Sequence, residues 1–300
     1  MNRRLALLLL TALTLQTAAR AQETPAAEEP AAKAIPVPAG YTSMLDTTYV
    51  QVGDWQGKMD IYLPPKTNGP SPAVIKIHGG GWTHGSRISP GGAYFHHGFA
   101  LINVEYRFTQ VAPAPAAIED SRCALKYVID HAAEWNIDPN KIILQGASAG
   151  GHLVLMTGLL GNDRRFDGNC PGSQNMKVAA IVDDYGPTDF TQPSWSVISK
   201  NKSAVLWLGT HANDEAFKAS VSPVTYVNKQ SSPVIIFHGD MDHTVPVEQS
   251  NVLEQKLKDA GVKTDLIMVK GAGHGKFTHD QTAMEEQTIQ DFLKSIGMMH

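Results

Sequence analysis

The sequence predicts an α/β protein built on one mostly parallel sheet with helices on both faces. Short apolar segments rich in β-branched residues alternate along the chain with longer segments of helical periodicity. Around Ser148, in the stretch 141–155 (KIILQGASAGGHLVL), a strand pattern changes sharply into a helix pattern. Each candidate site residue also follows a predicted strand, and parallel sheets place their sites beyond the carboxyl ends of their strands.

The first 40 residues differ in composition from the rest of the chain. Residues 1–21 (MNRRLALLLLTALTLQTAARA) combine Arg3 and Arg4, an apolar run and an Ala-Arg-Ala sequence, the pattern of a cleaved export signal. The apolar run is shorter than the roughly 20 residues of a membrane span. Residues 22–40 are rich in Ala, Pro and Glu, so we expect a flexible linker there. We therefore expect an exported protein, periplasmic or secreted, with one large domain over 41–300.

The net charge bears on the possible partners, and the cysteine content bears on a possible disulfide. The net charge is -4 and there is no basic block, which argues against nucleic acid or an anionic membrane as a partner. Cys123 and Cys170 are the only two cysteines. An even pair in an exported protein favours a structural disulfide, although two thiols that never meet are the alternative. Their spacing fits neither a metal site nor a CxxC redox pair.

The alternation predicts eight strands, with helices between several of them. The segments are 47–52, 58–63, 72–78, 99–106, 142–144, 178–183, 233–238 and 264–269. The first two flank a Gly/Asp/Trp turn and predict a hairpin-like start. Segments such as 72–78 (PAVIKIH) are nearly continuous apolar runs, typical of strands covered on both faces. Helices are expected over 116–135, after Ser148, over 247–260 and over 283–296.

Residues 189–232 are too many for a plain connection. We expect a short helical insertion here, at the rim of a pocket, where substrate choice would be made. The alternative is an ordinary helix of the layer with long loops. Within the segment, 204–208 is expected to be buried and 192–202 exposed, and Trp195, Trp207 and Tyr226 are its large aromatic residues.

Ser148 is the candidate nucleophile. Residues 146–150 (GASAG) match G-x-S-x-G between a strand and a helix. A sharp strand-to-helix turn crowds the backbone, so the neighbours of the serine must be small, and here they are glycine and alanine. The helix N-terminus beneath it favours developing negative charge. The alternative is a glycine-rich turn with an incidental serine.

The loop 78–82 (HGGGW) is the candidate oxyanion hole. Three glycines after a strand let backbone N–H groups face a cavity without side chains in the way, and the N–H of Ala149 would complete the set. The alternative is a flexible turn. We expect His78 to be a structural hydrogen-bonding residue, because the strand end buries it beneath the loop.

Two further loops supply an acid and a base. Residues 238–246 (HGDMDHTVP) hold Asp240 and Asp242, and spacing alone does not choose between them; Asp240 can equally stabilise the loop as an Asx-turn. His274 lies between glycines after the last strand, where it can reach a serine hydroxyl. The order serine, acid, histidine predicts a catalytic triad. Because no HExxH-like spacing exists, a metal site at His238 and His243 is disfavoured.

With these motifs the chain resembles the α/β-hydrolase-fold esterases. The resemblance rests on HGGGW, GASAGGH, DYGPTDF, HGDMDHTVP and GAGHG and spans roughly residues 47–296. It is closest to the small-cap branch that includes feruloyl and acetylxylan esterases and is related to the hormone-sensitive-lipase-like carboxylesterases. The chain departs from the expected pattern at Ser86 and Arg87, so we expect the loop beside Trp82 to be shaped differently.

The resemblance implies roles for individual residues. Ser148 matches the nucleophile and His274 the base, and the acid falls on Asp242. Gly80 and Gly81 match oxyanion-hole donors together with Ala149. Trp82 and Tyr185 would line the substrate pocket, although aromatic residues there can simply be packing.

The resemblance therefore implies an α/β-hydrolase catalytic domain over 41–300 that acts as an exported serine ester hydrolase through an acyl-enzyme, without cofactor or metal. Its expected substrates are small-molecule or oligosaccharide esters, acetyl or feruloyl, of plant cell-wall saccharides. The alternatives are an arylformamidase-like amidase, a peptidase of the same fold, or a non-catalytic binding module. A peptidase of this group usually has a propeller domain, which the length excludes, and an aromatic residue where this chain has Ala147.

Overall fold

The computed structural model describes residues 34–66, 69–194 and 202–299. The predicted signal segment therefore lies outside the described residues, as does most of the predicted linker. Residues 32–300 form one compact unit, which contains every element given below.

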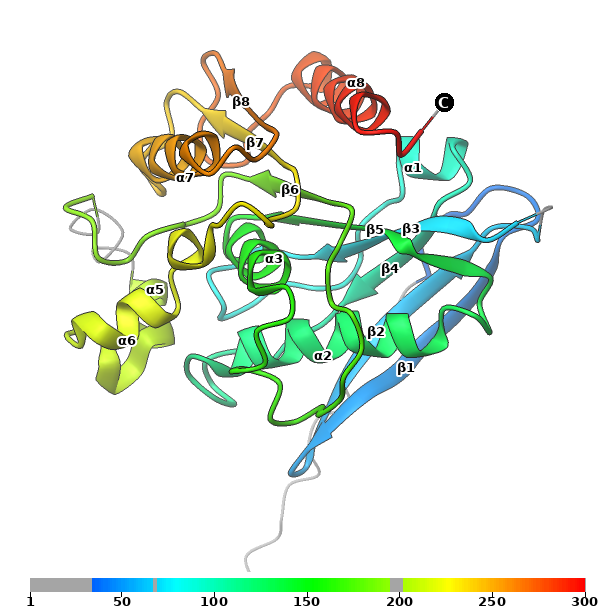
Figure 1. The fold of residues 1–300 in the computed structure, drawn as a ribbon, viewed down its shortest axis with the longest axis horizontal. Helices are drawn as coiled ribbons and strands as arrows, with labels where there is room; N and C mark the ends of the chain where they lie inside the picture. Colours follow the sequence, from blue (N-terminus) through cyan, green and yellow to red (C-terminus); the bar gives the residue numbers. More distant parts are fainter. Residues whose placement is uncertain (1–33, 67–68, 195–201, 300) are drawn as a thin grey trace, which may run out of the picture. The chain divides into compact units, whose positions relative to one another are not determined.

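One sheet of eight strands organises the described chain, in the order β1-β2-β4-β3-β5-β6-β7-β8 (Figure 1). The β1–β2 and β2–β4 pairs are antiparallel, and all other pairs are parallel. This confirms the predicted fold class. Several strands are longer than predicted, for example at the start of β1 and of β5. The strands are β1 (Thr42–Val52), β2 (Trp55–Leu63), β3 (Ser71–Ile77), β4 (Ala100–Val104), β5 (Ile137–Ala147), β6 (Ala180–Asp184), β7 (Val234–Gly239) and β8 (Thr264–Val269).

Helices cover both faces of the sheet and divide its core in two. The larger core packs α2 (Ala116–His131), α3 (Ala149–Leu160) and α7 (Glu248–Asp259) against one face. The other core packs α1 (Ala93–His96) and α8 (His279–Ser295) against the opposite face, and Figure 1 shows these two helices near each other. Every residue of α3, which follows Ser148, is buried, so this helix lies wholly within the core.

Helix α8 begins four residues earlier than predicted because a capping box fixes its start. The Thr278 hydroxyl accepts a hydrogen bond from the Gln281 amide at 3.3 Å, and the Gln281 side chain accepts one from the Thr278 amide at 2.8 Å. The short helix α1 was not predicted.

The segment 189–232 contains short helices joined by turns among its described residues. It holds α5 (Lys202–Leu208), η1 (Gly209–His211), α6 (Glu215–Ser220) and η2 (Pro223–Tyr226). Ala204, Trp207 and Leu208 are buried as expected, whereas Val205 and Leu206 are exposed. Trp195 and the rest of 195–201 lie outside the described residues.

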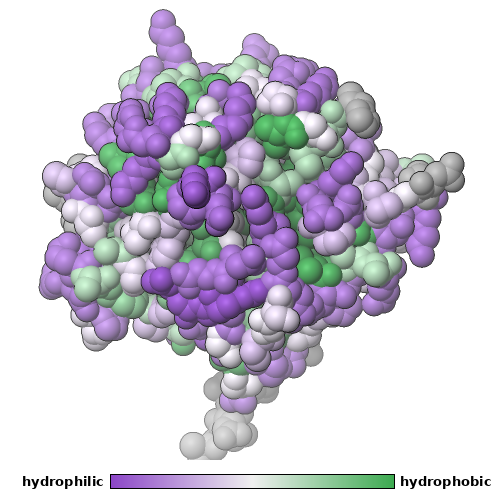
Figure 2. All heavy atoms as spheres, viewed as in Figure 1, coloured by the Kyte–Doolittle hydropathy of each residue, from purple (hydrophilic) through white to green (hydrophobic). Residues whose placement is uncertain are grey.

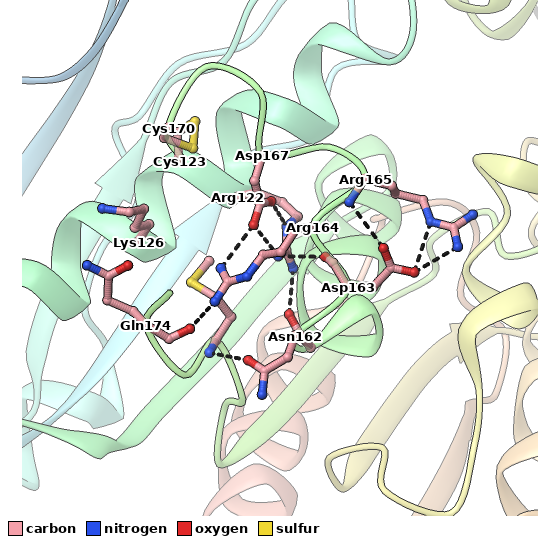
Figure 3. A network of polar contacts seen from close by, with 12 residues as sticks. Arg122, Cys123, Lys126, Asn162, Asp163, Arg164, Arg165, Asp167, Cys170 and Gln174 are labelled. Carbon is pink, nitrogen blue, oxygen red and sulfur yellow. Dashed lines mark hydrogen bonds and ion pairs between the residues drawn. A yellow bond between two sulfur atoms is a disulfide. The ribbon is translucent and has the colours of Figure 1, made fainter. Parts of the chain in front are cut away.

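The loop after α3 is fastened to α2 by a disulfide and a buried ion pair (Figure 3). Cys123 and Cys170 are bonded, with their Cα atoms 5.5 Å apart, which confirms the predicted bridge. The buried Arg122 guanidinium donates to Asp167 Oδ2 at 2.9 Å and to the carbonyl oxygens of Thr157 and Gly161. Each of these contacts satisfies a donor that burial would otherwise leave unpaired.

Arg87, where the sequence departs from the family pattern, anchors the loop after β3. Its guanidinium pairs with Asp46 of β1, with Asp60 of β2 at 3.0 Å and with Glu105 at 2.8 Å. The loop is thereby tied to the antiparallel edge of the sheet.

Hydrophilic side chains cover most of the face seen in Figure 2, and hydrophobic ones form small, separate groups. No helix among the described residues is both long enough and apolar enough to cross a membrane.

Candidate active site

The turn between β5 and α3 holds Ser148 in a conformation that few residues adopt. Its φ is 55° and its ψ is -118°, and its amide donates to the Asp184 carbonyl at 2.8 Å. A Cβ on Gly146 would lie 2.4 Å from the Gly150 carbonyl oxygen, and one on Gly150 would lie 2.1 Å from that of Ile77. The small neighbours that the motif prescribes are therefore a steric necessity.

The fold brings Ser148, His274 and Asp242 into one hydrogen-bonded chain. His274 Nε2 lies 2.8 Å from Ser148 Oγ, and His274 Nδ1 lies 2.7 Å from Asp242 Oδ2. The carboxylate fixes the proton on Nδ1, which leaves Nε2 free to accept the serine proton. These three residues come from three different loops at the carboxyl edge of the sheet, as the sequence order predicts.

Asp242 is held as a carboxylate. Burial raises its pKa, but hydrogen bonds from His238, His274 and the Val245 amide outweigh burial and keep the pKa well below its usual value. The other oxygen, Oδ1, accepts from the amides of Thr244 and Val245 at 2.7 and 3.0 Å. Asp242 is therefore ionised and held in place by its hydrogen bonds.

Asp240 contacts a backbone amide and not the imidazole of His274. Its Oδ1 accepts a hydrogen bond from the Gly271 amide at 2.6 Å, which fastens the loop that carries His274. The structure therefore separates the two aspartates that spacing left open: Asp242 contacts the imidazole, and Asp240 holds the loop.

His238 is a site residue that the sequence reasoning missed, since it considered this histidine only as a disfavoured metal ligand. It is fully buried, its Nδ1 lies 2.6 Å from Ser250 Oγ, and its Nε2 lies 2.9 Å from the Val245 carbonyl and 3.5 Å from Asp242 Oδ2. His238 therefore packs against the Asp242 carboxylate on its buried side. The signal was its place in the same HGDMDHTVP motif.

The glycine loop after β3, residues 78–82, lies directly beside the turn at Ser148. A Cβ on Gly79 would lie 2.8 Å from the Ala147 carbonyl oxygen. Gly80 and Gly81 have φ values of 116° and 59°, and a Cβ on Gly80 would lie 1.8 Å from the His84 carbonyl oxygen. Only glycine fits there. The assignment of Gly80, Gly81 and Ala149 as oxyanion-hole donors stays a prediction.

Trp82 is packed rather than open. Its side chain is 3% exposed, stacks on Trp207 of α5 with ring centroids 4.5 Å apart, and meets His152 edge-on at 5.3 Å. The helical insertion therefore supports the glycine loop from the core side. Tyr185 is half-buried, and its ring lies 4.8 Å from that of His274, so it flanks the base. A pocket-lining role for both residues stays a prediction.

His78 has the environment of a structural residue. Its ring stacks on Tyr106 at 4.6 Å, and its Nδ1 lies 2.7 Å from the Gly79 carbonyl. Burial lowers the pKa of His78 to about 4, so the ring is neutral at pH 7. Among the described residues, no group of three or more His, Cys, Asp or Glu is arranged to hold a metal ion.

A protein-family model described as BD-FAE matches residues 59–257, more than half of the chain. The chain belongs to the BD-FAE family. It is similar to the esterase LipC of Mycobacterium tuberculosis, 28% identical over 215 residues that make up 69% of this chain and 53% of LipC. It is also similar to the probable carboxylic ester hydrolase LipM of the same organism, 29% identical over 80% of this chain and 59% of LipM. This BD-FAE chain thus spans just over half the length of these relatives.

Solved structures show the same fold. A truncated carbohydrate esterase from gut microbiota superposes with a TM-score of 0.75 at 28% identity, over 87% of this chain and 98% of that one. A propionate-bound esterase of the planctomycete Thermogutta terrifontis superposes with a TM-score of 0.72 at 27% identity, over 87% of this chain and 96% of that one. The BD-FAE chain therefore has the α/β-hydrolase fold, as its motifs imply.

Proposed function

We propose that this BD-FAE chain is a serine carboxylic ester hydrolase. The observation that carries the proposal is the hydrogen-bonded chain from Ser148 Oγ through His274 to Asp242, with distances of 2.8 and 2.7 Å. Nucleophile, base and orienting acid are within hydrogen-bond reach of one another, which is the geometry that activates a serine. The names of the esterase relatives and the esterase structures agree with this chemistry.

The proposed reaction has two halves. Ser148 Oγ forms a bond to the ester carbonyl carbon while its proton passes to His274 Nε2. The backbone N–H groups of Gly80, Gly81 and Ala149 hold the oxyanion. The C–O bond of the ester then breaks, and the alcohol leaves with the proton from His274. Water attacks the acyl-enzyme by the same route and releases the acid, while Asp242 stabilises the charged imidazole in both halves.

For the substrate we propose acetyl or feruloyl esters of plant cell-wall saccharides. The motif resemblance to feruloyl and acetylxylan esterases supports this, as does the similarity to a structure described as a carbohydrate esterase. The structure of the Thermogutta enzyme is described as propionate-bound, so that relative binds a short carboxylate. In the present chain, the insertion that carries α5 and α6 would select the alcohol, because it packs against the glycine loop through Trp207.

We further propose that the protein is exported. The support is the signal-like composition of residues 1–21 and the Cys123–Cys170 disulfide, since such bonds persist in oxidising compartments.

The experiment that tests the function compares initial rates on p-nitrophenyl acetate, methyl ferulate and acetylated xylo-oligosaccharide. Three proteins are needed: wild type, Ser148→Ala and the control Ser173→Ala, which changes an exposed loop serine. We expect Ser148→Ala to lower the wild-type rate at least about a thousandfold and Ser173→Ala to leave it unchanged. Wild type inactive on all three esters, or full activity of Ser148→Ala, would contradict the proposal. Hydrolysis of N-formylkynurenine in place of the esters would favour the arylformamidase alternative.

A further inference from the structure

A row of polar side chains crosses the interior of the sheet on the α1/α8 face. Asp60, Asn103, Lys76 and Gln145 are successive in-register partners on β2, β4, β3 and β5. Cross-strand partners point to the same face. The neighbouring row on the same face, two positions away along each strand, is apolar, as expected of a core. It consists of Tyr62, Leu101, Val74 and Ile143. Because burying polar groups without partners costs free energy, the polar row calls for an explanation.

A cavity of about 180 Å³ lies above this row. Its floor includes Lys76 and Gln145, and its walls come from residues 90–94 and from α8. The volume is several times the ~30 Å³ share of one water molecule in the liquid. Gln145 is buried, whereas Glu286 on the wall is exposed, so the cavity runs from the sheet to the surface. None of its lining residues belongs to the triad or to the glycine loop.

Several buried polar atoms around this cavity are left without protein partners. Among the described residues, Gln145 Oε1 and Tyr94 Oη are buried and make no hydrogen bond. The same holds for Asn103 Oδ1 in the adjoining part of the row. Gln145 is only 6% exposed, and its amide nitrogen is already committed to Asp184 Oδ2 at 3.2 Å. Two of the three unpaired atoms are amide oxygens, which only accept. An occupant must therefore supply hydrogen-bond donors.

The charges around the cavity select against ions of either sign. The Lys76 ammonium, which donates to the Pro90 carbonyl at 3.2 Å, would repel a second cation. An anion would meet the Glu286 carboxylate on the wall, which would repel it. Burial raises the pKa of Asp184 to about 7 and that of Glu285 to about 8, so near neutral pH these carboxyl groups both donate and accept.

We propose that this cavity binds a small neutral polyhydroxylated molecule, of the size of a monosaccharide or cyclic polyol. Hydroxyl groups both donate and accept, so one such molecule can pair with Gln145 Oε1, Tyr94 Oη and the remaining donors of Lys76 together. The inference concerns a second site on the far face of the sheet from α3, and it does not depend on the ester hydrolase activity.

The test is calorimetric and NMR-detected binding of myo-inositol and D-xylose to the whole protein, with n-butylamine and acetate as charged probes. Tyr94→Phe removes one hydroxyl group, and Gln145→Leu removes the amide at nearly constant size. The matched control is Tyr41→Phe, because the Tyr41 hydroxyl already donates to Phe95 and Phe99 carbonyl oxygens and does not line the cavity.

We expect at least one polyol to bind, Tyr94→Phe and Gln145→Leu each to weaken binding about tenfold, and Tyr41→Phe to leave it unchanged. If Gln145→Leu fails to fold, Tyr94→Phe alone carries the comparison. Several results would overturn the proposal: no polyol binding to folded wild type, binding indifferent to the variants, or stronger binding of butylamine or acetate. Binding that is lost in Trp82→Ala but kept in Tyr94→Phe would place the molecule elsewhere and would also overturn it.

Discussion

Asp240 and Asp242 lie two positions apart on one loop, yet the fold gives them different partners. Asp242 Oδ2 is 2.7 Å from His274 Nδ1, whereas Asp240 Oδ1 is 2.6 Å from the Gly271 amide. A carboxylate on the imidazole controls its tautomer and charge, and a carboxylate on a loop amide controls only position. The pair therefore provides an internal comparison for the proposed mechanism.

We predict that Asp242→Asn lowers kcat for p-nitrophenyl acetate by roughly 10³–10⁴-fold, because an amide favours the wrong tautomer of His274. Asp240→Asn keeps an acceptor oxygen for Gly271 and should change kcat by less than about threefold. Steady-state kinetics and melting curves of both variants check this. Equal losses of kcat in the two variants would show that Asp242 acts only by holding the loop.

The turn at Ser148 shows how closely β3, β5 and α3 approach one another. A methyl group at Gly150 would meet the Ile77 carbonyl oxygen at 2.1 Å, whereas one at Gly168 meets nothing within 4 Å. The backbone atoms at Gly150 belong to packed elements that have no room to move.

We predict that Gly150→Ala destabilises the protein by about 2–3 kcal/mol or more and abolishes esterase activity, because Ser148 is displaced when the turn opens. Gly168→Ala should change stability by less than about 0.5 kcal/mol. Urea unfolding of both variants measures this. A Gly150→Ala protein with wild-type stability and activity would contradict the packing account.

Helix α8 meets the sheet through carboxyl groups whose pKa values are raised by burial, to about 7 for Asp184 and about 8 for Glu285. In the unfolded chain these groups titrate near 4. At pH values between the unfolded-state pKa and the folded-state pKa, the folded chain retains protons that the unfolded chain has released. The free energy of unfolding therefore falls as the pH rises through this range. The loss ends once the pH exceeds the folded-state values.

We therefore predict a melting temperature that falls by a few degrees between pH 5 and pH 8.5, as measured by calorimetry. Glu285→Gln, which mimics the protonated acid, should flatten this slope, and Glu286→Gln, at the exposed neighbouring position, should leave it unchanged. A steeper slope in Glu285→Gln, or no slope in wild type, would show that the carboxyl groups near α8 do not hold these protons.

At the scale of the whole molecule, the disulfide joins α2 to the loop after α3 across 47 residues of sequence. Closing a loop of this size restricts the unfolded chain, and loss of such a bond typically costs 2–5 kcal/mol. The neighbouring Arg122–Asp167 pair keeps the loop in place in the folded state.

We predict that the Cys123→Ala, Cys170→Ala double variant unfolds with a free energy about 2–4 kcal/mol below that of the oxidised wild type, while each folded molecule keeps its activity. Wild type in dithiothreitol should match the variant, and the variant should not respond to the reductant. Equal stability with and without reductant in wild type would mean that the bond does not form.

Much of this architecture was predictable because its signals are local. The strand-turn-helix pattern at Ser148, the glycines after β3 and the order serine, acid, histidine each lie within one segment. The parallel topology then brings strand ends to one edge, so the approach of Ser148 and His274 to an acidic loop could be expected without coordinates. The choice of Asp242 over Asp240 needed the family resemblance, because both aspartates lie on one loop and their spacing from the other motifs does not distinguish them.

The rest depended on contacts between distant positions. Lys76 lies inside an otherwise apolar strand, and only the register of β3 with β4 and β5 reveals that it is part of a polar row. The stacking of Trp82 on Trp207 joins residues 125 positions apart in sequence, a pairing that no periodicity encodes. The start of α8 was missed although its signal is local, since Thr278 and Gln281 form the Thr-x-x-Gln pattern of a capping box. The helix α1 has only four residues and no side-chain cap, so the sequence offers no comparable signal for it.

The central claim, that Ser148 is the nucleophile of an ester hydrolase, is tested most directly by covalent trapping. The protein is treated with diethyl p-nitrophenyl phosphate and analysed by intact mass and peptide mapping, alongside residual p-nitrophenyl acetate hydrolysis. We predict one diethylphosphoryl group per chain, located on Ser148, with activity lost in proportion to labelling and no labelling of Ser148→Ala. Labelling at another residue, or full activity in a protein labelled at Ser148, would contradict the account.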